Sequence, residues 1–258
     1  MDRSDLYPEP PHLSAGLYAE YGERALFSRV CVALIAAGAE PTGVIGVAPR
    51  AQGFKMVSDL GADYQELGLK PDRLLAIASD ADPGQRAIRM GFRRKPSGLI
   101  VVGYDFADRD DDHAVSLLTA AESLGVPQEL QSGAELRRAR KRGGDFVDLV
   151  RRIIENADPL YGEIGVEIST PTPHTLMKDT ETVLPGDLFV SDRLLADAPA
   201  VRSGLLACFS EGAVSSWENG LHLSCWGMLN DRGVTIPESM GVPRRAARLL
   251  SRALAHRR

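Results

Sequence analysis

The spacing of hydrophobic residues predicts a helix near the start of the chain. Leu26, Phe27, Val30 and Leu34 recur at the three- and four-residue spacing of one helix face, and Gly38 ends the pattern. Other segments are β-branched or continuously apolar, which is typical of strands. The strongest of them, 98–104, is apolar at nearly every position and is expected at the centre of a sheet.

The same criteria predict elements along the rest of the chain. Strands are predicted over residues 16–21, 42–47, 73–78, 98–104, 160–168 and 188–191. Helices are predicted over residues 23–37, 82–90, 113–124, 133–157, 198–209 and 243–258. The helix over 133–157 is expected to break at Gly143-Gly144, with Asp145 capping the second part. Asn219-Gly220 between two apolar segments predicts a β-hairpin.

This order of elements predicts the fold class. Strands and helices alternate through residues 16–126, which favours an α/β or α+β fold with a layered sheet and helices in the N-terminal half. The C-terminal half, with its prolines and hairpin, is expected to be α+β. We expect a flexible lead-in over 1–15, an α/β unit over 16–142 and an α+β unit over 143–258; the two units together are also compatible with one domain.

Composition narrows the class of protein. Hydrophobic residues make up 44% of the chain and charged residues 25%, as in ordinary globular proteins. The net charge of −5 argues against a surface built throughout for nucleic acid. The three cysteines lack the spacing of a disulfide framework or a cysteine zinc site. No signal-peptide pattern and no membrane-length apolar run occurs, so we expect a soluble, cytoplasmic protein without a membrane partner.

Acidic residues follow two of the predicted strands. Asp80 and Asp82 come after 73–78, and Asp105 and Asp108 come after 98–104. Such residues would meet if the two strand ends were neighbours, and carboxylate oxygens are ligands that Mg²⁺ prefers. The four aspartates are therefore a candidate metal site, with Mg²⁺ as the cofactor. The simpler alternative needs no cofactor: Asp82 caps the next helix, Asp80 belongs to a turn, and the later aspartates lie in a solvated loop.

The segment from Ser79 to Ala87 resembles the Asp-x-Asp strand end of Toprim domains, which occur in topoisomerases and primases. The resemblance covers only this segment. It implies a glutamate at the end of an earlier strand, and Glu20 or Glu23 is available for that position.

Basic and aromatic residues are further candidates for binding. Arginines and lysines cluster over residues 137–142 and again along 244–258. Each cluster fits phosphate contacts, or more simply a solvated helix face. Trp217 and Trp226 flank the predicted hairpin and are candidate partner-binding residues, with packing of the sheet as the alternative.

Two functions are compatible with these observations. The first is a non-catalytic protein-interaction or regulatory protein, such as a bacterial protein that binds or neutralises another protein. It is favoured because no nucleophile elbow, P-loop, zinc or dinucleotide motif occurs in the chain. The alternative is a divalent-metal-dependent enzyme acting on a phosphate-containing or nucleic-acid substrate. A protein partner is thus expected, nucleic acid is not favoured, and a homo-oligomer is compatible with the sequence.

Overall fold

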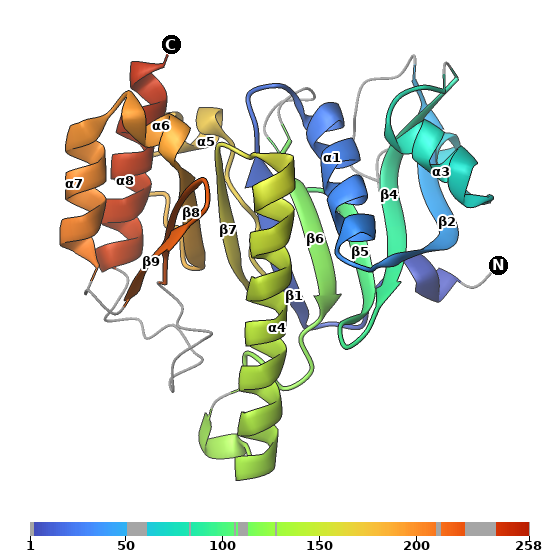
Figure 1. Cartoon of the computed structure of the whole chain (residues 1–258), viewed down its shortest axis with the longest axis horizontal. Coiled ribbons are helices and arrows are strands. Elements are labelled where there is room, and N and C mark those ends of the chain that lie inside the picture. The colour runs from blue at the N-terminus through green and yellow to red at the C-terminus, as the bar shows by residue number, and fades with distance from the viewer. Residues whose placement is uncertain are drawn as a thin grey trace.

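The structure, a computed structural model, is built on one ten-stranded antiparallel sheet (Figure 1). It describes residues 3–50, 61–82, 84–105, 107, 113–126, 128–209, 213–224 and 241–257. The strands are β1 (His12–Tyr18), β2 (Glu40–Pro49), β3 (Gln65–Gly68), β4 (Gln85–Arg94), β5 (Gly98–Tyr104), β6 (Val115–Ala120), β7 (Tyr161–Val166), β8 (Asp187–Ser191), β9 (Val214–Trp217) and β10 (Gly220–Leu223). Their order across the sheet is β3-β2-β4-β5-β6-β1-β7-β8-β10-β9.

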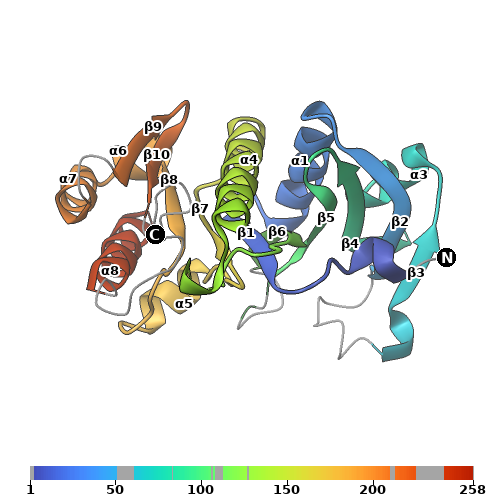
Figure 2. The same ribbon diagram turned by 90° about the horizontal axis from the view of Figure 1, so that it is seen from below.

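Helices cover both faces of this sheet. They are α1 (Glu23–Ala36), α3 (Pro71–Ala78), α4 (Gly133–Ala157), α5 (Pro173–Lys178), α6 (Asp192–Ala196), α7 (Pro199–Cys208) and α8 (Gly241–His256), with short 3₁₀ turns η1 (Arg3–Leu6), η2 (Gly61–Asp63) and η3 (Gln128–Leu130). Helices α1 and α4 lie side by side on one face, and α5 and α8 lie on the opposite side near the β8 end (Figure 2). The predicted mixed α and β fold class is confirmed.

Side-chain alternation in β1 separates the two faces. Leu13, Ala15 and Leu17 belong to the hydrophobic core that packs against α1 and α4. Ser14 and Gly16 point to the other face, because successive residues of a strand alternate. A second core joins β7, β8 and β10 to α5, α6, α7 and α8.

Several predicted elements are confirmed with shifted ends. The helix over 23–37, the strands over 42–47, 98–104, 160–168 and 188–191, the helices over 198–209 and 243–258, and the hairpin correspond to α1, β2, β5, β7, β8, α7, α8 and β9–β10. The predicted lead-in differs, because β1 begins at His12 and Leu6 in η1 is fully buried.

The strand predicted over 73–78 is wrong, since these residues belong to helix α3. Pro71 is well placed in the first helical turn, and the buried residues Leu74, Ile77 and Ala78 follow the spacing of one helix face. A short apolar run fits a buried strand and a buried helix equally well when it is judged by composition.

The helices predicted over 82–90 and 113–124 are also wrong. Residues 85–94 form β4, paired with β2 and β5, and residues 115–120 form β6, paired with β5 and β1. Pairing on both sides and burial on both faces override local helix signals, as is usual for central strands.

Helix α4 does not break at Gly143-Gly144. It runs unbroken over 25 residues, and Gly143 is buried within it. Its N-cap is Ser132, the residue before the helix. The Ser132 hydroxyl accepts a hydrogen bond from Glu135 N–H, and the Glu135 carboxylate accepts one from Ser132 N–H, which is a capping box. The boundary predicted between residues 142 and 143 therefore falls inside this helix.

Candidate functional site

The predicted metal ligand Asp80 lies among arginines. Its carboxylate is 3.1 Å from the Arg50 guanidinium and 3.8 Å from that of Arg24 on α1. Arg50 also donates to the carbonyl oxygens of Asp80 and Asp82, at 2.9 and 2.6 Å. These contacts fasten the end of β2 to the turn that leads into β4.

Asp82 is buried, and its side chain stabilises a turn instead of capping a helix. Its Oδ1 accepts a hydrogen bond of 2.9 Å from Gly84 N–H, and its other oxygen forms an ion pair with Arg73 on α3. The expectation that Asp82 caps a helix is thus wrong, because β4 follows it. Both Asp80 and Asp82 have arginine partners in the structure.

The two glutamates implied by the Toprim resemblance also bind arginines. Glu23 is held by Arg86, and its other oxygen accepts a hydrogen bond of 3.1 Å from His113 N–H. Burial raises the pKa of Glu23 above its ordinary value. Glu20 lies 2.9 Å from Arg257. The Asp-x-Asp segment follows helix α3, not a strand, so the Toprim arrangement is not formed.

Asp105 lies on the opposite face of the sheet from α1. Its Oδ2 accepts a hydrogen bond of 3.1 Å from Thr170 N–H, and desolvation raises the pKa of Asp105 to about 6. Asp105 lies near Glu163 of β7, which the sequence did not indicate as a site residue: burial, and then the charges of Asp105 and Asp187, raise the pKa of Glu163. Glu163 is a lone glutamate in an apolar strand, a signal that single-strand patterning could have flagged as a buried charge.

The four-aspartate metal site stays a prediction, because Asp108 lies outside the described residues. Asp80 and Asp105 are on different faces of the sheet, as their partners on α1 and near Thr170 show. Within the described part of the chain, no group of three or more His, Cys, Asp and Glu side chains is arranged to hold a metal ion.

The first turns of α4 carry a projecting cluster of cations. Figure 1 shows this end of α4 extending beyond the lower edge of the sheet. The exposed side chains on it, called here the basic segment, are Arg137, Arg138, Arg140 and Lys141. The first buried position of the helix is Ala139, so the start of α4 gains little from the core. Leu130, in the preceding η3 turn, is 72% exposed.

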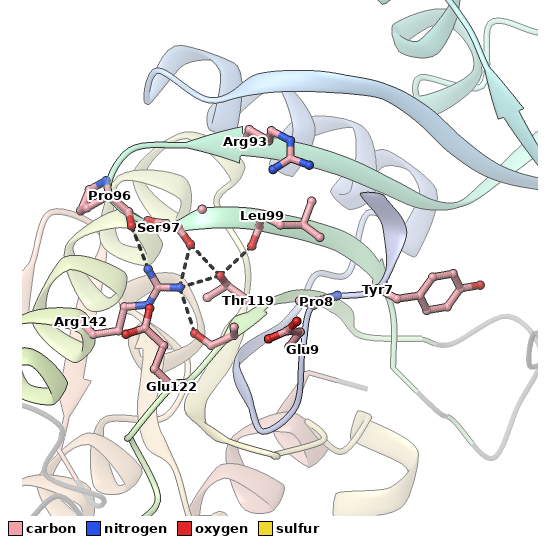
Figure 3. Close-up of a pocket in the computed structure, with 12 residues that line it drawn as sticks. Tyr7, Pro8, Glu9, Arg93, Pro96, Ser97, Leu99, Thr119, Glu122 and Arg142 are labelled. Carbon is pink, nitrogen blue, oxygen red and sulfur yellow. Dashed lines mark hydrogen bonds between the residues drawn. The ribbon is translucent and has the colours of Figure 1, made fainter. Parts of the chain in front are cut away.

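Arg142, the last residue of the predicted basic cluster, is not a solvated side chain. Its terminal nitrogens donate to the carbonyl oxygens of Pro96, Ser97 and Ala120, at 3.0, 2.7 and 2.9 Å, and to Thr119 Oγ1 at 3.1 Å (Figure 3). Arg142 thereby anchors α4 to the β4–β5 turn and to the end of β6.

A cavity of about 330 Å³ opens beside this anchor (Figure 3). Tyr7 and Pro8 form one wall, and the carboxylates of Glu9 and Glu122 stand at its rim. Because Arg142 already donates to protein oxygens, it organises the wall of the cavity rather than offering a free cation to a ligand.

Trp217 is half-buried at the edge of the sheet. Its ring stacks on His222 with 4.5 Å between centroids and lies 5.8 Å from Phe189. Packing of the hairpin accounts for these contacts. Trp226 lies outside the described residues, so the partner-binding role of the two tryptophans stays a prediction.

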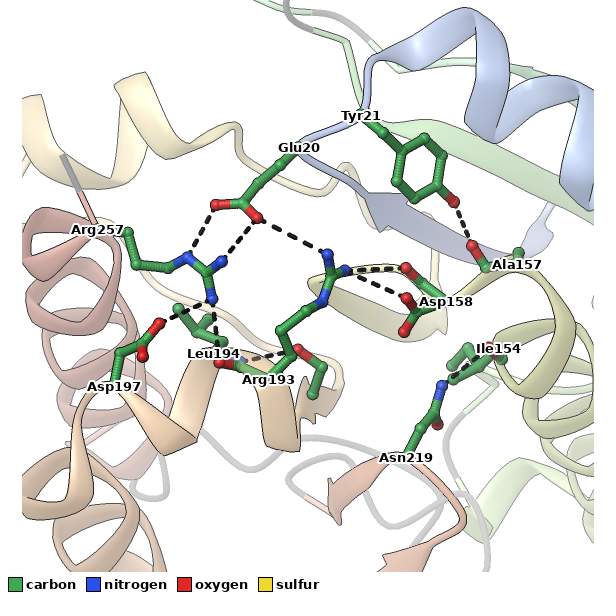
Figure 4. Close-up of polar contacts among 11 residues, drawn as sticks. Glu20, Tyr21, Ile154, Ala157, Asp158, Arg193, Leu194, Asp197, Asn219 and Arg257 are labelled. Atoms are coloured by element: carbon green, nitrogen blue, oxygen red, sulfur yellow. Dashed lines mark hydrogen bonds and ion pairs between the residues drawn. The ribbon is translucent and has the colours of Figure 1, made fainter.

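The arginines at the C-terminal end of the chain differ in their contacts. Arg244 and Arg248 of α8 form ion pairs with Glu181. Arg245 and Arg252 are exposed, whereas Arg257 takes part in a network between distant segments (Figure 4). Arg257 binds Glu20 and lies 3.1 Å from Asp197, and Arg193 bridges Glu20 and Asp158. The network joins the end of the second core to the turn between β1 and α1.

Comparison with known proteins gives little beyond this description. No family model matches the chain, and no curated protein sequence matches it. Among solved structures it is similar to the Pseudomonas aeruginosa T6SS protein PA0821. The similarity covers 95% of this chain and 72% of the other, with 12% identity and a TM-score of 0.39. A likeness of this size carries no argument about function.

None of the helices in the described ranges combines sufficient length with sufficient hydropathy to cross a bilayer.

Proposed function

We propose that this chain is a non-catalytic protein-interaction protein that uses the basic segment of α4 to bind an acidic surface of another protein. The observation that supports this most directly is the projection of Arg137, Arg138, Arg140 and Lys141 beyond the sheet, all exposed within two helical turns. The proposal includes that this contact inhibits or regulates the partner protein.

The charge of the segment contrasts with that of the whole chain. The whole chain carries a net charge of −5, whereas this end of the molecule carries a dense group of exposed cations. Complementary charge speeds encounter and fixes orientation between proteins. The exposed Leu130 beside it adds apolar surface, which a protein interface can bury.

The segment is also held at both of its ends, which favours binding. The Ser132–Glu135 capping box fixes the first turn of α4, and Arg142 fixes the helix to the sheet just after the last exposed cation. A preordered helix loses less conformational entropy on binding than a loop does.

A protein partner is favoured over nucleic acid at this surface. Proteins that bind single strands combine cations with aromatic stacking surfaces, and residues 133–142 contain no aromatic residue. Binding of duplex DNA by phosphate contacts alone would also be opposed by the net negative charge of the chain.

The proposal is tested with two matched charge reversals. One variant carries Arg137→Glu and Lys141→Glu in the basic segment, and the control carries Arg245→Glu and Arg252→Glu on α8, so both change the net charge equally. Partners are crosslinked in a bacterial lysate, identified, purified and titrated directly. We expect the basic-segment variant to weaken the dissociation constant by about tenfold or more, and the control to change it less than about twofold.

Two results would contradict this function. If both variants weaken binding equally, the effect is that of net charge and not of a surface. If the wild type binds a labelled DNA duplex more tightly at 150 mM salt than any purified protein partner, nucleic acid is the ligand. The metal-dependent enzyme remains the alternative prediction.

A further inference from the structure

A buried polar site lies on the sheet face opposite α1, independent of the basic segment. Asp105 comes to it from the end of β5, Glu163 from β7, and Thr170 from the segment after β7. Glu163 and Thr170 are each 1% exposed. Among the described residues, no arginine, lysine or histidine forms an ion pair with either carboxyl group. Glu163 is thus buried near Asp105, which is only partly buried, and Glu163 has no cationic partner of its own. Asp187, which lies 3.7 Å from the His222 ring, also raises the pKa of Glu163.

Glycines make room for these side chains. In the ladder, Gly16 of β1 lies between Ser116 of β6 and Glu163 of β7. A Cβ atom on Gly16 would lie 2.7 Å from Asp105 Oδ2 and would collide with the Thr170 hydroxyl. A Cβ atom on Gly186 would lie 2.7 Å from Glu163 Cγ. The backbone is therefore shaped so that acidic and hydroxyl groups gather over the sheet.

Two buried oxygens of the site have no hydrogen-bond partner in the described part of the protein. They are Glu163 Oε2 and Thr170 Oγ1. Two other oxygens of the site have partners: Glu163 Oε1 accepts a hydrogen bond of 2.7 Å from Gly186 N–H, and Asp105 Oδ2 accepts one from Thr170 N–H. Buried oxygens without partners are uncommon, and they often mark the position of a bound water or ion.

We propose that Asp105, Glu163 and the Thr170 hydroxyl bind one divalent, oxygen-preferring cation. Two carboxylates balance the charge of such an ion, and carboxylate and hydroxyl oxygens suit Mg²⁺, Mn²⁺ or Ca²⁺. The site shares Asp105 with the predicted four-aspartate cluster, but its other ligands come from β7 and the segment that follows it.

The test is a thermal melt of the full chain, stripped with chelator and then supplied with 5 mM MgCl₂, MnCl₂ or CaCl₂. Four proteins are compared: the wild type, Glu163→Gln, Thr170→Val and the control Glu122→Gln, which changes an exposed carboxyl group. We expect at least one metal to raise the melting temperature of the wild type and the control by about 4 °C. Glu163→Gln loses the rise, and Thr170→Val reduces it.

Isothermal titration of the wild type with the active metal should show one site per chain. Thr170→Val keeps the size of the side chain and both acidic groups. If Glu163→Gln does not fold, the metal affinity of Thr170→Val is the test, and we expect it to be about tenfold weaker than that of the wild type. The inference is overturned if no metal moves the melting temperature, or if both site variants respond as the wild type does. Neither result bears on the basic segment, whose partner binding is measured separately.

Discussion

At the scale of single residues, two ionisable side chains, Glu163 and Arg142, form hydrogen bonds with the backbone inside the protein. Glu163 is buried with one hydrogen bond, to Gly186 N–H. Arg142 reaches into the end of the sheet and donates to three carbonyl oxygens and one hydroxyl. Burying such groups costs free energy unless their partners remain in place.

Glu163 should make the protein less stable as pH rises from 6 to 8. The folded protein keeps the Glu163 proton up to about pH 8, whereas the unfolded chain has released it near the ordinary glutamate pKa, so unfolding becomes easier across this interval. Glu163→Gln has no proton to lose and still accepts from Gly186. With chelator present, we expect urea denaturation at pH 8 to show the variant more stable by about 1–3 kcal/mol.

The control for this prediction is Glu122→Gln, which changes an exposed carboxyl group at the rim of the cavity. It should keep the pH dependence of the wild type. A wild type whose stability is flat or rises between pH 6 and 8 would contradict the assignment of a raised pKa to Glu163.

Arg142 and Lys141 should differ sharply although they are neighbours. Arg142→Ala leaves the carbonyl oxygens of Pro96, Ser97 and Ala120 without this donor, and we expect a loss of about 2–4 kcal/mol in the free energy of unfolding. Lys141→Ala, at an exposed position, should change it by less than about 0.5 kcal/mol. Chemical denaturation measures both. Equal losses would mean that the contacts of Arg142 contribute no stability.

At the scale of elements, α4 has two functionally different parts. Its C-terminal turns pack Phe146, Val150 and Ile153 into the core, whereas its first turns have no buried residue before Ala139. The stability of the first part therefore rests on its cap and on the Arg142 anchor. Because that part carries the basic segment, the cap also supports the proposed binding surface.

Ser132→Ala should loosen the start of α4 without unfolding the protein. The substitution removes the acceptor for Glu135 N–H, which is worth about 1 kcal/mol to a helix start. We expect amide hydrogen exchange of residues 135–138 to accelerate about fivefold, while residues 146–154 exchange as in the wild type. Ser132→Asp should restore protection, because aspartate is an equally good cap. Faster amide exchange along the whole of α4 would contradict the conclusion that its two parts are stabilised separately.

At the scale of the whole molecule, one sheet carries both cores, and a polar network joins their ends (Figure 4). Strands β1 and β7 pair over six residues at the junction. Arg257, near the end of the chain, is bound to Glu20, which follows β1. The last helix is thus tied to the first strand–helix turn.

The Arg257–Glu20 contact should couple the two halves measurably. Its two hydrogen-bonding distances of 2.9 and 3.0 Å indicate a paired guanidinium–carboxylate contact on partly exposed side chains. In a double-mutant cycle of Arg257→Gln and Glu20→Gln, we expect a coupling energy of about 0.5–1 kcal/mol that declines in 1 M salt. The measurement is the free energy of unfolding of the four proteins. Additive effects would show that the contact contributes no net stability.

The sequence by itself determined the elements whose signals are local. The spacing of Leu26, Val30 and Leu34 predicts α1, because side-chain periodicity depends on near neighbours. Asn219-Gly220 predicts the hairpin but not the place of its turn: the two turn residues are Glu218 and Asn219, and Gly220 pairs with Trp217 as the first residue of β10. The apolar segment 98–104 likewise identified a central strand. The mixed fold class follows from such elements.

Tertiary structure alone decided the rest. Residues 85–94 and 115–120 are strands because long-range partners pair with them on both sides, and no local signal records those partners. The same is true of the sites. Glu163 meets Asp105 because ladder register sets which side chains converge on one face, and Arg142 meets the β4–β5 turn because α4 packs on the sheet. Register depends on the whole sheet, so it could not be derived from any one segment.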